Sequence, residues 1–171
     1  MKKLIIFFSF ITITLTLSAQ KNIETTDRIS LEGKVKTKLS FSLKDLEAFP
    51  AKHIDSIVVY NHLLEPRKTI LNIKGVLLKD LIDKAGIDND SPKLLSEFYI
   101  TCIASDNYKV VYSWNEIFNT PNGESVIIIT EADGKKADQF SDSIAMLSAA
   151  DKATGRRYVK GLRQIMVSRV Q

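Results

Sequence analysis

Residues 74–86 have the sequence KGVLLKDLIDKAG, in which apolar and charged residues alternate with a helical period. Three- and four-residue spacings place the apolar residues on one stripe of a helix: Leu77, Leu78, Leu81, Ile82 and Ala85. Gly86 follows the last of them, where glycine commonly ends a helix. The pattern predicts an amphipathic helix over Gly75–Gly86 that packs on a hydrophobic core.

Short strand-like runs surround this helix. Alternating or β-branched apolar patterns predict strands near Ile29–Leu39, Ser56–Tyr60, Lys68–Ile73, Glu97–Ser105, Val126–Thr130 and Leu162–Val170. A capping-box spacing at Ser42–Asp45 predicts a short helix to about Phe49, and Ser113–Glu116 has the same pattern. Glu65-Pro66 predicts a hairpin connection, and Asp133-Gly134 a tight turn. Because helices and strands do not alternate regularly, we expect an α+β fold with mixed β-sheets.

Length and composition limit the class of protein. The chain has 171 residues, 44% of them hydrophobic and 26% charged, which is typical of one globular domain. Its 24 Lys+Arg and 20 Asp+Glu give a net charge of +4, or +2 without Lys2 and Lys3 of the N-terminal segment, and a general polyanion binder is usually more basic. The single cysteine, Cys102, excludes an intramolecular disulfide and any multi-cysteine metal site.

The N-terminal segment has the three parts of a secretory signal peptide. Lys2 and Lys3 precede an apolar run that ends at Leu17, and small residues stand before Gln20. The run is shorter than the roughly 20 residues that a membrane anchor needs. We expect residues 1–19 to be removed, residues 20–28 to form a flexible lead, and residues 29–171 to form one domain that is periplasmic or secreted. Without Lys2 and Lys3, 22 basic residues face 20 acidic ones, a net charge of +2.

Few residues suit catalysis or metal binding. His53 and His62 are the only histidines, and the scattered aspartates do not have the spacing of a calcium loop. Cys102 lies within an apolar strand, which predicts a buried, unreactive thiol. Tyr112 and Trp114 stand beside a helix start, where they could line a pocket or belong to the core. We therefore expect no metal site.

The C-terminal segment is basic and contains no acidic residue after Asp151. Within Gly155–Gly161, Arg156, Arg157 and Lys160 suit contacts to a phosphate or a sulfate. The other interpretation is a basic loop that faces solvent. A nucleic-acid site is disfavoured, because the aromatic platform usual for single strands is missing.

Three blocks of the sequence together resemble the molybdopterin-binding domain of the sulfite oxidase family, in particular small exported members. They are Lys74–Gly86, Ser105–Tyr108, and Asp151-Lys152 followed by Gly155–Lys160. The resemblance covers about residues 30–170. It implies an α+β fold of mixed sheets, a central pocket and basic side chains that meet the phosphate of the pterin. Arg156, Arg157 and Lys160 would then form one wall of the pocket, and Tyr60 and His62 the opposite wall.

Two departures from the family concern its chemistry. Catalytic members bind molybdenum through a cysteine thiolate just before the Gly-Val-Leu helix, whereas Ile57–Glu65 contains no cysteine. The soft thiolate is part of the electronic structure of the metal, so a phenol or an imidazole does not replace it. The family's Gly-Pro-Leu-Arg-Leu stretch corresponds here to Asp142–Met146, which lacks the glycine, the proline and the arginine.

Two hypotheses follow from these observations. The first is an exported, non-catalytic binding module that takes a small anionic ligand or a partner protein and carries no cofactor or metal. The second is an oxidoreductase that binds a molybdenum cofactor through the pterin, without a protein thiolate. The resemblance makes molybdopterin the candidate cofactor. The N-terminal segment lacks the twin arginines of proteins exported in the folded state with a cofactor inside, which favours the first hypothesis.

Overall fold

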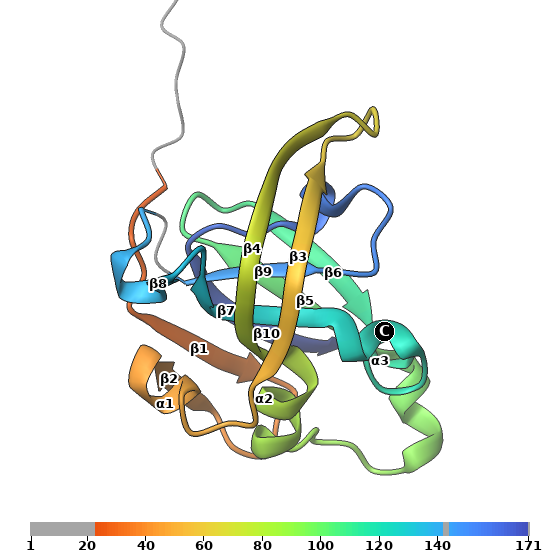
Figure 1. The fold of residues 1–171 in the computed structure, drawn as a ribbon. Helices are drawn as coiled ribbons and strands as arrows, with labels where there is room; N and C mark the ends of the chain where they lie inside the picture. The colour runs from red at the N-terminus through yellow and green to blue at the C-terminus, as the bar shows by residue number, and fades with distance from the viewer. Residues whose placement is uncertain (1–22, 142–143, 171) are drawn as a thin grey trace, which may run out of the picture.

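The computed structural model describes residues 23–141 and 144–170, so the segment assigned to the signal peptide lies outside the described residues. Two five-stranded sheets, with strand orders β2-β1-β10-β5-β6 and β3-β4-β7-β8 with β9 on β7, are linked by short helices (Figure 1). The strands are β1 Arg28–Gly33, β2 Leu39–Ser42, β3 Lys52–Tyr60, β4 Pro66–Leu77, β5 Phe98–Ala104, β6 Lys109–Ser113, β7 Val126–Ala132, β8 Lys135–Lys136, β9 Ala145–Ser148 and β10 Leu162–Arg169. The α-helices are α1 Leu43–Leu46, α2 Leu78–Ala85 and α3 Trp114–Phe118, and the 3₁₀ helices are η1 Pro92–Glu97, η2 Pro121–Ser125, η3 Ala137–Gln139 and η4 Thr154–Arg157.

The first sheet is mixed. Strand β1 pairs with β10 in parallel, with Leu31 opposite Ile165, whereas β1–β2, β10–β5 and β5–β6 are antiparallel. In the second sheet β4 pairs antiparallel with β3 and with β7. This arrangement confirms the predicted α+β class with mixed sheets.

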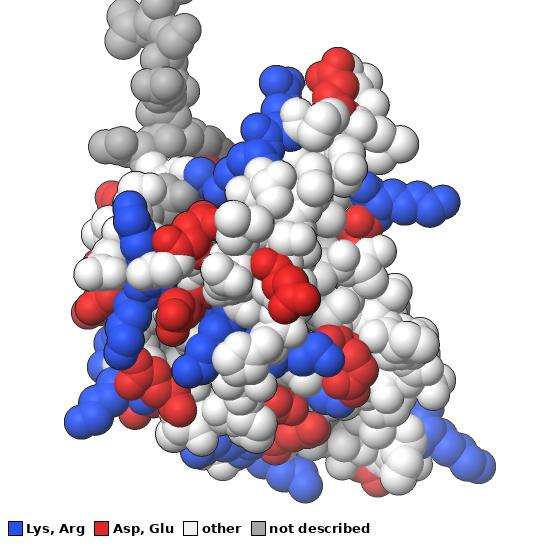
Figure 2. Space-filling view, viewed as in Figure 1, with Lys and Arg blue, Asp and Glu red and all other residues white. Residues whose placement is uncertain are grey.

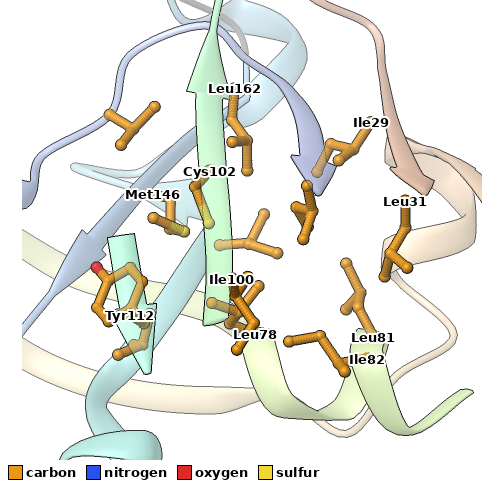
Figure 3. Packing of buried hydrophobic residues seen from close by; sticks show 14 of the residues in the cluster. Ile29, Leu31, Leu78, Leu81, Ile82, Ile100, Cys102, Tyr112, Met146 and Leu162 are labelled. Atoms are coloured by element: carbon orange, nitrogen blue, oxygen red, sulfur yellow. The ribbon is translucent and has the colours of Figure 1, made fainter. Parts of the chain in front are cut away.

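The larger of two hydrophobic clusters lies between the first sheet, α2 and part of β7. Leu78, Leu81 and Ile82 of α2 face Ile100 of β5 and Leu31 of β1, as Figure 3 shows. Strand β7 also reaches the smaller cluster. Val126 and Ile128 belong to the larger cluster and Ile129 to the smaller one. This strand is therefore buried on both faces, which explains its continuous apolar sequence.

Several predicted elements are confirmed with changed bounds. Gly86 ends α2 with a φ of 66°, and Ser42 caps α1 in a reciprocal capping box with Asp45. Helix α1 ends at Leu46 rather than near Phe49. Part of the 23–28 lead makes contacts, since the Ser105 hydroxyl donates to the Glu24 carbonyl at 2.8 Å.

The predicted helix start at Gly75 is wrong. Gly75, Val76 and Leu77 are the last residues of β4, and α2 begins only at Leu78. Gly75 pairs with Lys52 on one side and Ile129 on the other, so two neighbouring strands fix it in the sheet. Leu77 and Leu78 are both buried, one on the strand and one on the helix. Their apolar spacing is therefore compatible with either element, and pairing between strands decides the outcome.

Gly75→Ala should destabilise the fold by about 3 kcal/mol, the upper part of the range for overpacking a core. An added Cβ would overlap the Ile127 side chain and the Ile128 carbonyl oxygen. Gly134→Ala is the control, because its Cβ meets nothing within 4 Å and adds only the positive-φ cost of about 1–2 kcal/mol. Urea unfolding measures the free energy of unfolding of both variants. Equal losses of stability would contradict the close approach of β7 to Gly75.

Candidate functional site

An open groove of about 470 Å³ lies between the end of β3 and the loop that carries η4. It is lined by Val59, Tyr60, Asn61, His62, Arg67, Gly155, Arg156, Tyr158 and Lys160. Four of the five residues predicted for a site line this groove: Tyr60, His62, Arg156 and Lys160. Segments that are about a hundred residues apart in the sequence thus form one surface.

The side chain of Thr154 attaches the η4 loop to β3. Its hydroxyl accepts a hydrogen bond from the Tyr60 amide at 2.8 Å and donates one to the Val58 carbonyl at 2.9 Å. Gly155 continues the contact, because a Cβ there would lie 2.6 Å from the Tyr60 carbonyl oxygen. The loop therefore completes the hydrogen bonding of the β3 edge, and this fixes the distance between the two walls of the groove.

Tyr158 forms the boundary of the groove. The Lys68 Nζ lies 4.9 Å and the Lys160 Nζ 5.8 Å from the centre of its ring. Lys68 also donates to the Tyr158 hydroxyl at 3.3 Å. Beyond the ring lies a neighbouring pocket of about 370 Å³ that Lys68 and Tyr158 also line. Tyr158 therefore holds two cationic side chains close to the groove.

The electrostatics of the groove favour anions. Arg67, Arg156 and Lys160 supply positive charge, and none of the residues that line the groove in the described part of the chain is a carboxylate. Glu65 lies outside the lining, with its carboxylate 3.8 Å from the Arg67 guanidinium. A guanidinium presents two parallel N–H groups to a phosphate or a sulfate. The groove can therefore bind an oxyanion through charge-assisted hydrogen bonds.

Arg157, the fifth predicted site residue, does not line the groove. Its Nε donates to Asp151 at 2.7 Å, and its Nη1 donates to Glu116 at 2.6 Å. The guanidinium also lies 4.4 Å from the ring centre of buried Tyr112. The hydrogen bond to Asp151 is the main cause of a raised Arg157 pKa. We correct the expectation that Arg157 contacts the anion, because two carboxylates already engage its side chain.

Arg67 is the groove cation that the sequence analysis missed. It follows Pro66 at the start of β4 and lines the groove together with His62. The available signal was its position one residue after the predicted Glu65-Pro66 connection. Hairpin pairing brings such a residue opposite the end of the preceding strand.

The groove does not suit a molybdenum centre held by a protein thiolate. Cys102 lies on β5, is fully buried in the larger cluster and does not line the groove. Burial raises its pKa well above the ordinary value of 9.0, so the thiolate is strongly disfavoured. In the described residues no three His, Cys, Asp or Glu side chains gather as metal ligands. The cations of the groove do suit the phosphate of a pterin.

Comparison with known proteins finds similarity only in structure. No protein-family model and no curated protein matches the chain. The fold is similar to that of the sulfane dehydrogenase SoxCD from Paracoccus pantotrophus, with a TM-score of 0.61 and 16% sequence identity. The match covers 85% of this chain and 39% of that chain, so this chain spans less than half the length of the matched one. At this identity the similarity shows the fold alone, and it confirms the predicted sulfite oxidase-like α+β fold.

Arg157→Ala should lower the free energy of unfolding by about 3 kcal/mol, because it leaves Asp151 and Glu116 without their cation. The three side chains are only 15–24% exposed. Arg156→Ala is the neighbouring control and should change stability by less than about 0.5 kcal/mol, since this side chain is exposed. Urea unfolding of both variants tests this assignment. Equal stabilities would mean that the Arg157 ion pairs contribute nothing.

Alkaline pH should destabilise the protein through Cys102. Above pH 9 the unfolded state releases the thiol proton and the folded state keeps it, so stability falls by up to about 1.4 kcal/mol per pH unit. The Tyr112 pKa is also raised by burial, so its effect follows above its ordinary value of 10.0. Unfolding free energies at pH 8 and near pH 10 measure the slope. Cys102→Ala should reduce the slope of stability against pH. An unchanged slope would assign the alkaline destabilisation to other groups.

Proposed function

We propose that this chain is an exported, non-catalytic module that binds a small phosphate- or sulfate-bearing anion in the groove between β3 and η4. The observation that carries the proposal is the convergence of Arg67, Arg156 and Lys160 on a groove whose described lining residues include no carboxylate. Export is supported by the signal-like N-terminal sequence. No helix within the described residues is long and apolar enough to cross a membrane.

The walls of the groove are suited to hold an anion. Thr154 and Gly155 fix the loop to β3, so the groove does not have to form when a ligand arrives. The exposed Arg156 side chain forms no ion pair with any described residue, so its guanidinium can turn toward a ligand. A preformed site loses less conformational entropy on binding. The anion would thus add charge-assisted hydrogen bonds to an existing frame.

The residues of the groove give little support to catalysis. The soft ligand that molybdenum needs is absent from its lining, and Cys102 is enclosed in a separate cluster. His62 is the histidine of the groove, and the described residues that line the groove include no carboxylate or thiol to pair with it. A paired donor and acceptor is the usual arrangement for acid–base or nucleophilic catalysis.

The second candidate is an oxidoreductase that holds a molybdenum cofactor through the phosphate of its pterin alone. The fold similarity over 85% of this chain favours it. Fold does not determine function, because one scaffold supports different sites. Molybdenum analysis, with pterin fluorescence after oxidative release, separates the two candidates in protein purified from its own source. Stoichiometric molybdenum would support the second candidate.

Isothermal titration with inorganic phosphate and sulfate tests the anion site. Arg156→Ala and Lys160→Ala should each weaken binding by about 1.5–3 kcal/mol, the range for a hydrogen bond to a charged group. Lys93→Ala is the matched control, because Lys93 is an exposed cation on η1 that does not line the groove. If both groove variants bind like the control, the loop is only a solvent-exposed basic segment.

A further inference from the structure

The hairpin of β3 and β4 projects beyond the rest of its sheet, as Figure 1 shows. Strands β3 and β4 pair from Lys52 opposite Gly75 to Tyr60 opposite Pro66. Strand β7 pairs with β4 only at residues 74–77. In the distal half of the hairpin the described strands β3 and β4 pair only with each other, and the η4 loop contacts the β3 edge through Thr154. Its connecting residues, 61–65, form the projecting end of the molecule.

Two leucines stand at this end. Leu63 is 64% exposed and Leu64 is 56% exposed. Adjacent exposed leucines at a projecting turn differ from single apolar residues scattered over a surface, which need no explanation. They place apolar surface farthest from the core, where no described part of the chain covers it.

Asn61 holds the leucines in this position. Its Oδ1 accepts hydrogen bonds from the Leu63 amide at 2.9 Å and the Glu65 amide at 3.0 Å. Its Nδ2 donates to the Glu65 carboxylate at 2.8 Å. Leu64 adopts a φ of 62°, a left-handed conformation that is unfavourable for a leucine. The turn is thus a built feature in which an asparagine network maintains an unfavourable backbone.

Cations lie just behind the leucines. Arg67 follows Leu64 by three residues, at the start of β4, and it lines the groove with Arg156 and Lys160. These cations outnumber the Glu65 carboxylate at the tip. In Figure 2 basic side chains flank the projecting end of the molecule. An apolar tip with cations behind it suits a bilayer, where apolar side chains enter the acyl boundary and basic side chains meet anionic headgroups.

We propose that the hairpin tip docks this protein on an anionic lipid surface, with Leu63 and Leu64 inserted among the acyl chains and a lipid phosphate in the basic groove. This inference rests on the proposed anion site and assigns its phosphate to a phospholipid headgroup. A bilayer fits better than a protein partner. A projecting tip can enter a fluid bilayer, which does not have to present a complementary cavity. The cations on both walls of the groove can contact the lipid headgroups.

Co-sedimentation of the protein with vesicles tests the docking. Vesicles of phosphatidylglycerol and phosphatidylcholine in equal parts should bind the protein, and pure phosphatidylcholine should bind it at least about tenfold more weakly. The double variant Leu63→Ser/Leu64→Ser should lose about tenfold or more of the affinity for the anionic vesicles. Val111→Ser is the matched control, because Val111 is 54% exposed on edge strand β6, outside the hairpin and the groove. Circular dichroism establishes that both variants are folded.

Inorganic phosphate separates this inference from the proposed function. The tip variant should bind phosphate like the wild-type protein, because its substitutions leave every groove cation in place. If the tip variant and wild type bind anionic vesicles equally, lipid docking is overturned and the anion site still stands. Lipid docking is also overturned if the wild-type protein does not bind vesicles. If the tip substitution then removes binding to a protein, the tip is a protein contact. If Arg156→Ala leaves phosphate binding unchanged but abolishes vesicle binding, the groove binds only a lipid surface. The proposal that it binds a small free anion then fails.

Discussion

The pairing of β4 with β7 is the contact on which the rest of the molecule depends. At Gly75 the strands approach so closely that the Ile127 side chain and the Ile128 carbonyl occupy the space of a Cβ. Strand β7 supplies side chains to both hydrophobic clusters, and β4 runs from this contact into α2 at one end and the projecting hairpin at the other. A change at this point therefore affects the core and the frame of the groove together.

The groove depends on a second set of contacts that fix the η4 loop from two directions. Thr154 binds the loop to the β3 edge, and Arg157 binds it to Asp151 and to Glu116 of α3. Glu116 is the residue whose spacing predicted a capping box, yet its carboxylate contacts Arg157. Ser113 alone caps the helix, accepting from the Glu116 amide at 3.0 Å. With Arg157 turned inward, Arg156 and Lys160 are left on the side of the loop that faces the groove.

Local patterns predicted much of this fold. The apolar stripe of Leu78, Leu81, Ile82 and Ala85 is buried as expected, and the Ser42–Asp45 spacing forms its capping box. The helix was predicted to begin at Gly75, too early, because the strand and helix periods give the same apolar spacing there. Pairing with distant residues decides which element forms. The short strand β9 was also missed, because its four residues are buried by pairing with β7 and carry no alternating pattern.

The site was predicted less completely, for an electrostatic reason. A basic loop in a sequence shows how many cations are present but not which of them meets a carboxylate after folding. Arg157 meets Glu116, which is 41 residues away, and this pairing depends on where α3 lies. Arg67 was missed for the converse reason, because only the pairing of the hairpin brings it to the groove that His62 also lines.

The scaffold separates two kinds of chemistry that the sulfite oxidase-like fold is expected to combine. The only thiol, that of Cys102, lies within the larger cluster, where burial raises its pKa. The cations line the open groove, beside Val59 of the smaller cluster. A metal centre needs the thiolate and the anion contacts in one cavity, whereas an anion site needs only the cations on a rigid frame. Thr154 and the Arg157 ion pairs fix the η4 loop beside β3, so Arg156 and Lys160 share one frame with Arg67.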